Sequence, residues 1–98
     1  MSFAHRIRNY YEQPVAEEIH RQLAAVESRE DHGKLADIAC VALNRLPPRY
    51  IRYEVDMAFY MSPDELVMMR EQISDAVREA IQFVEQHQRD DGDDDDII

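Results

Sequence analysis

The segment 62–88 constrains the fold of this chain more than any other part of the sequence. It opens with Ser62, a proline and then Glu65, which is the pattern of a helix N-cap, a first-turn proline and a capping box. The residues that follow at spacings of three and four are Leu66, Met69, Ile73, Ala76, Ala80, Phe83 and His87. This heptad spacing predicts one long helix whose seam packs against other helices, with two small alanines that allow a close approach.

Two further helices are predicted before this segment, and the first covers residues 7–27. Its apolar side chains recur every four positions, which predicts one buried helix face. Pro14 interrupts the pattern, because proline removes a helical hydrogen bond and clashes with the preceding turn. The helix therefore either kinks at Pro14 or begins near Gln13, with Pro14 in its first position.

Residues 34–46 form the most apolar of the three predicted helices. A helix that is apolar nearly all round is expected in the centre of a structure. Asp31 is the expected N-cap, and Cys40 is expected to be a small buried residue. Pro47 and Pro48 end the helix, because the residue before a proline avoids the helical conformation.

Residues 50–61 alternate between apolar and polar side chains, which is the period of an extended strand. A lone strand in a helical chain leaves its backbone groups without partners. It could pair with the same strand of a second copy across a two-fold axis. A short helix over 53–61 is the alternative.

These segments predict a small, mainly α-helical domain over residues 1–89, with three main helices and a short extended or helical segment at 50–61. Because a chain of 98 residues buries only a thin core, a two-fold homodimer is expected. Six aspartates within residues 90–98 form an acidic tail. A run of like charges repels itself, so the tail is expected to be disordered.

Charge and composition exclude several classes of function. Residues 1–89 hold 15 acidic and 11 basic residues, a net charge of −4, which disfavours direct binding of nucleic acid or of an anionic membrane. No apolar run approaches the roughly 18 residues that a membrane span needs. With one cysteine and no export signal, the expected location is the cytoplasm.

No arrangement of residues predicts catalysis or a cofactor. The sequence lacks a set of nucleophile, base and orienting residue, and two glycines are too few for a glycine-rich phosphate loop. The four histidines are scattered and lack the spacing of metal ligands. We therefore expect no enzymatic activity, no catalytic residue, no metal site and no cofactor.

The stretch DIACVALNRLPPRY, residues 37–50, carries the polar residues of most interest. Asp37 and Asn44 are seven positions apart and share a helix face, where they need hydrogen-bond partners within the fold or in a ligand. Arginines and tyrosines follow around a Pro-Pro corner; arginine forks match phosphates, and tyrosine rings stack on bases. The candidate ligand-binding residues are Asp37, Asn44, Arg45, Arg49, Tyr50 and Arg52.

This stretch resembles the signature of the late-competence-development ComFB family, in which an acidic residue and a short apolar helix precede L-N-x-L-P-P-x-Y. The matching positions are Asp37, Leu43, Asn44, Leu46, Pro47, Pro48 and Tyr50. RNYYEQPVAEEI, residues 8–19, also resembles the first helix of the family. The resemblance implies a small, mostly helical, dimeric bacterial regulator without enzymatic activity. Some members hold zinc through cysteines, but residues 27–32 contain none, so zinc is not expected.

The resemblance and the residues lead to three hypotheses of function. Some family members are receptors for cyclic dinucleotides such as cyclic di-GMP or cyclic di-AMP, so the first hypothesis is a cyclic dinucleotide receptor that acts on an unknown downstream protein. A two-fold dimer would present its arginines and tyrosine twice to a ligand of similar symmetry. The second hypothesis is a dimeric protein–protein adaptor without a small-molecule ligand. The third is an acidic regulator whose tail competes for a basic surface.

Overall fold

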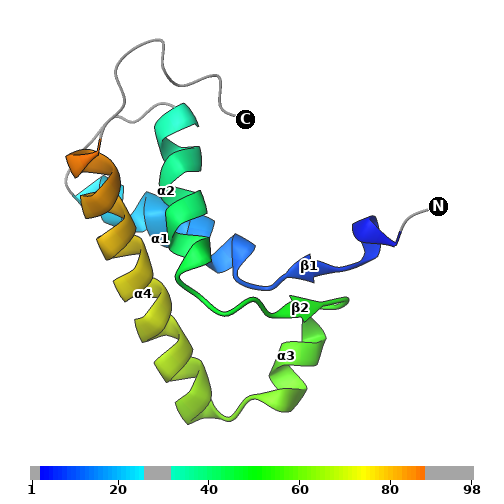
Figure 1. Cartoon of the computed structure of the whole chain (residues 1–98). Helices are drawn as coiled ribbons and strands as arrows, with labels where there is room; N and C mark the ends of the chain where they lie inside the picture. The colour runs from blue at the N-terminus through cyan, green and yellow to red at the C-terminus, as the bar shows by residue number, and fades with distance from the viewer. Residues whose placement is uncertain (1–2, 26–31, 88–98) are drawn as a thin grey trace.

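The computed structural model describes residues 3–25 and 32–87, which form a mainly helical domain (Figure 1). In chain order its elements are η1 (Ala4–Arg6), β1 (Arg8–Asn9), α1 (Glu12–Ala25), α2 (His32–Asn44), β2 (Tyr50–Ile51), α3 (Val55–Tyr60) and α4 (Pro63–Gln86). The mainly α fold predicted from the sequence is confirmed. The predicted acidic tail at 90–98 and the predicted N-cap at Asp31 lie outside the described residues.

The long helix α4 begins as predicted. The Ser62 hydroxyl accepts a hydrogen bond from the backbone N–H of Glu65 over 3.2 Å, and the Glu65 carboxylate accepts one from the backbone N–H of Ser62 over 2.8 Å. This capping box satisfies N–H groups that have no partner inside the helix. The buried residues of α4 are Met69, Ile73, Ala76, Val77, Ala80 and Val84. Because α4 packs against both α1 and α2, most of the predicted seam is used within one chain.

Helix α1 begins at Glu12, so Pro14 lies in its first turn, where a missing N–H costs no helical hydrogen bond. Of the two predicted arrangements, the later start is therefore confirmed and a kinked helix from residue 7 is wrong. Ile7 is extended, and β1 follows it. The predicted stripe on this helix is buried in the core at Tyr11, Val15, Ile19 and Leu23.

Helix α2 is less buried than its composition predicts. Only Ile38 and Ala42 are fully buried, while Cys40 and Asn44 are exposed. The expectation that Cys40 is a buried residue is therefore wrong. The physical reason is that α2 contacts α1 and α4 and leaves its remaining face uncovered within the described residues.

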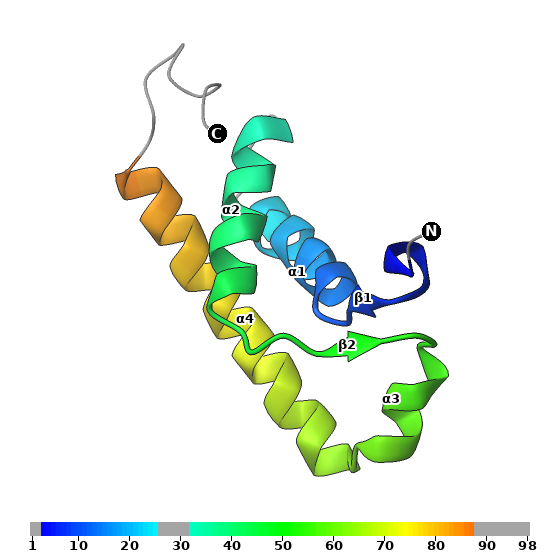
Figure 2. The ribbon, with the colours of Figure 1, turned by 45° about the vertical axis from the view of Figure 1, so that its right-hand side comes forward.

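Residues 50–61 divide into two short elements (Figure 2). β2 pairs antiparallel with β1 of the same chain, with Arg8 opposite Ile51, so the strand does not need a second copy as a partner. A helix then follows as α3, so the strand predicted over the whole segment is wrong beyond its first residues. The alternation arose because Ile51 of β2 and Met57 of α3 both enter the core.

The fully buried side chains should dominate the stability of this domain. Val77 in α4 is fully buried, whereas Val55 in α3 is 56% exposed. Val77→Ala removes buried methyl groups and leaves a cavity, so we expect it to lower the free energy of unfolding by about 2 kcal/mol. The matched change Val55→Ala should cost less than about 0.5 kcal/mol. Urea denaturation followed by circular dichroism measures both, and equal losses would contradict this core.

Candidate functional site

The pair of strands brings together the two segments that carry the family resemblance (Figure 2). The Asn9 side-chain oxygen accepts hydrogen bonds from the backbone N–H groups of Tyr11, over 3.2 Å, and of Arg49, over 3.0 Å. The backbone N–H of Tyr10 donates to the carbonyl oxygen of Arg49 over 2.6 Å. The start of α1 and the loop before β2 are therefore held together by a small set of hydrogen bonds around Asn9.

Four exposed residues next to this junction form what we call the arginine–tyrosine surface, which consists of Arg49, Tyr50, Arg52 and Tyr53. Tyr50 is 65% exposed and Tyr53 is 55% exposed. The guanidinium carbon of Arg52 lies 5.0 Å from the centre of the Tyr53 ring, which is the distance of a cation–π contact. Burial raises the pKa of Tyr11, and the positive charge of Arg49 opposes that shift.

Three of the predicted ligand-binding residues, Arg49, Tyr50 and Arg52, are exposed and lie in or directly beside β2. The other three lie elsewhere. Arg45 makes an ion pair with Glu79 of α4 over 3.3 Å. Asn44 donates to the backbone oxygen of Cys40 over 2.8 Å, so its amide is satisfied within its own helix.

Asp37 lies about two helical turns before Asn44 on α2. It lines a shallow pocket between α2 and α4 together with Cys40 and His87. Among the residues that the structure describes, no ion pair to Asp37 is present. The predicted residues on α2 therefore do not converge with those of β2. The reason is that α2 is a stiff helix whose exposed face is set by the positions of α1 and α4.

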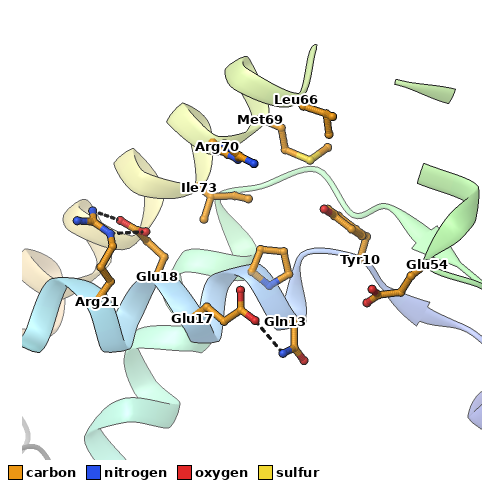
Figure 3. A pocket seen from close by; sticks show the side chains of 11 residues that line it. Tyr10, Gln13, Glu17, Glu18, Arg21, Glu54, Leu66, Met69, Arg70 and Ile73 are labelled. Atoms are coloured by element: carbon orange, nitrogen blue, oxygen red, sulfur yellow. Dashed lines mark hydrogen bonds and ion pairs between the residues drawn. The ribbon is translucent and has the colours of Figure 1, made fainter. Parts of the chain in front are cut away.

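A larger hollow lies between α1 and α4, and no predicted residue lines it (Figure 3). We call it the α1–α4 groove; its volume is about 510 Å³. Its lining includes Tyr10 and Pro14, which belong to the RNYYEQP segment, and the charged residues Glu17, Glu18 and Arg70. The sequence offered one signal for this groove, because apolar residues of the predicted seam lie at its floor.

Fold and surface together define a small, mainly helical domain with an exposed cluster of arginine and tyrosine. Residues 8–88 match the model of the family described as late competence development protein ComFB, and the chain belongs to that family. This confirms the resemblance and places the protein among bacterial competence-related regulatory proteins. A comparison with curated proteins finds no match.

Within residues 3–25 and 32–87, no helix combines the length and the apolar character that crossing a membrane requires. Over the same residues, no group of three or more histidine, cysteine, aspartate or glutamate side chains could hold a metal ion.

The hydrogen bonds accepted by Asn9 are expected to contribute to the stability of the fold. Asn9→Leu leaves two backbone N–H groups without their acceptor, so we expect the free energy of unfolding to fall by about 1 to 3 kcal/mol. Asn9→Asp keeps an accepting oxygen at the same place and is the matched control. Urea denaturation measures the loss, and amide hydrogen exchange at Tyr11 and Arg49 locates it. Equal stability of the leucine and aspartate variants would contradict the anchoring role.

The lowered pKa of Glu18 predicts how the stability of the fold depends on pH. The hydrogen bonds from Arg21 lower the pKa of the Glu18 carboxyl from 4.5 to about 2, with Gln22 contributing and burial opposing the shift. Because the folded pKa is depressed, the stabilisation is fully present above pH 4.5 and is lost as the pH falls towards about 2. The stability difference between wild type and Glu18→Gln should therefore shrink across that window, as measured by thermal denaturation. The stability difference between wild type and Arg21→Gln should shrink in the same pH window. A stability difference that does not depend on pH would contradict the contribution of the Glu18–Arg21 pair.

Proposed function

We propose that this ComFB-family protein is a non-enzymatic cytoplasmic regulator that binds a cyclic dinucleotide, cyclic di-GMP or cyclic di-AMP, at the arginine–tyrosine surface. It acts as a homodimer and signals the bound state to a downstream protein. One observation carries the proposal. Among the described residues, Arg49 and Arg52 make no ion pair, whereas Arg8, Arg21, Arg45 and Arg78 each have a carboxylate partner. The surface therefore holds two guanidinium groups that are available to an anion.

The chemistry of a cyclic dinucleotide matches the groups on this surface. Such a ligand has two phosphates and two purines. Guanidinium forks bind phosphate oxygens through paired, charge-assisted hydrogen bonds, and aromatic rings stack on bases. Arg49 and Arg52 supply the first kind of contact, and Tyr50 with Tyr53 the second. Because these side chains are already exposed, no part of the core has to open.

A homodimer supports the proposal through symmetry. The arginine–tyrosine surface is open, so one chain covers only one side of a ligand, whereas small-molecule sites usually bury most of the ligand surface. A second copy related by a two-fold axis presents the same four residues from another direction. The ligand has two similar halves, and each half would meet one copy of Arg49 and Arg52.

A dimeric protein–protein adaptor without a small-molecule ligand is the alternative, and a specific observation favours it. Val55 lies two positions after Tyr53, and both side chains are more than half exposed. Exposed aromatic side chains next to arginines are typical of protein interfaces, and Val55 adds apolar area beside them. On this alternative the same surface binds the downstream protein directly.

Isothermal titration calorimetry separates the two functions. The folded full-length chain is titrated with cyclic di-GMP and cyclic di-AMP, and with GTP and ATP as controls. We expect binding of a cyclic dinucleotide at micromolar or lower dissociation constants, weakened at least about 10-fold in Arg49→Ala and Arg52→Ala because a charge-assisted contact is lost. Arg78→Ala is the matched control, because Arg78 pairs with Asp75 on α4, away from this surface.

No heat with any of the four nucleotides from a folded protein would exclude the receptor and favour the adaptor. Binding that is unchanged in both Arg49→Ala and Arg52→Ala would place the ligand elsewhere on the molecule.

A further inference from the structure

The α1–α4 groove has an apolar floor (Figure 3). Leu66, Met69 and Ile73 of α4 line it at spacings of three and four, and Pro14 of α1 also lines it. Residues at these spacings form one stripe along a helix. A groove with such a floor is the kind of surface on which the apolar face of another helix packs.

The first turns of α4 are the part of the helix that forms this floor. They extend past the ends of α1 and α2 (Figures 1 and 2). Val67 lies in these turns and is 52% exposed. It is three positions before Arg70, which lines the groove, so the two side chains share one flank of α4. Val67 therefore extends the apolar floor outwards to solvent.

The two walls of the groove carry opposite charges that are not paired with each other. Glu17 of α1 accepts a hydrogen bond from Gln13 over 3.0 Å, and Arg70 stands on α4 across the groove (Figure 3). Within the described residues, neither Glu17 nor Arg70 makes an ion pair. Glu18, next along α1, differs because Arg21 pairs with it.

We propose that the α1–α4 groove is the interface of the homodimer, occupied by the first turns of α4 of a second copy. In this arrangement Val67 packs on the partner's apolar floor, and Arg70 lies opposite the partner's Glu17. This inference rests on the homodimer that the proposed function includes, but it does not depend on a nucleotide ligand.

Charge complementarity selects a second copy as the occupant. In a two-fold interface, if one residue contacts another across the axis, the reverse contact is also made. Among its described lining residues, the groove carries one unpaired charge of each sign, so two copies neutralise all four charges at once. An unrelated helix that is purely basic or purely acidic would match one wall and be repelled by the other.

A reciprocal charge swap tests the interface. Glu17→Arg and Arg70→Glu are made in separate chains, and the monomer–dimer equilibrium is measured by sedimentation. We expect each variant alone to dimerise at least about 10-fold more weakly than wild type, because like charges then face each other twice. An equimolar mixture should recover dimers, since both contacts then join an arginine to a glutamate. An ion pair formed within one chain could not produce this recovery.

Further variants and outcomes make the test decisive. Val67→Asp should weaken dimerisation without unfolding, because Val67 is exposed in one chain. Arg78→Glu makes the same charge change further along α4 and should leave the equilibrium unchanged. A monomeric wild type, dimers unaffected by the swaps, or a mixture that stays monomeric would each overturn the interface. Because sedimentation uses no nucleotide, failure of the calorimetry would overturn only the ligand site.

Discussion

The contact of α4 with α1 and α2 is the constraint on which the rest of the structure depends. Ala76 and Ala80 are small, so the two shorter helices approach the axis of α4 closely in the middle of its length. This close contact fixes which faces of α1 and α2 remain outside. The first turns of α4 extend past the ends of the two shorter helices (Figure 1), and they border the α1–α4 groove.

The hydrogen bonds around Asn9 hold the arginine–tyrosine surface in place relative to the helices. The two strands are only two residues each, so strand pairing alone holds the loop weakly. The side-chain oxygen of Asn9 adds two hydrogen bonds, one to the start of α1 and one to the backbone of Arg49. The position of the surface is therefore set from the N-terminal end of α1 and not from α2, which precedes it in the sequence.

How much was predictable depended on whether the deciding contacts are local. The start of α4 was predictable because the capping box of Ser62 and Glu65 acts over three residues. The grouping of Arg49 and Arg52 was predictable because they are neighbours in the sequence. The exposure of Cys40 was not, because it depends on the sides from which α1 and α4 approach α2. The alternation over residues 50–61 led to a wrong prediction of one long strand. A short strand followed by a helix can also place its apolar residues at alternate positions of the sequence.

Tyr10 belongs to both of the surfaces described above. Its backbone N–H holds the carbonyl of Arg49 beside the arginine–tyrosine surface, while its side chain lines the α1–α4 groove. On the proposed function and interface, a second copy in the groove would restrain the residue that helps to place Arg49, and a ligand on the arginines would restrain a residue of the groove. Thermodynamic linkage requires such an influence to be mutual. Each binding event changes the free energy of the other by the same amount. If both proposals hold, Tyr10 would connect self-association to ligand binding through one residue of this small domain.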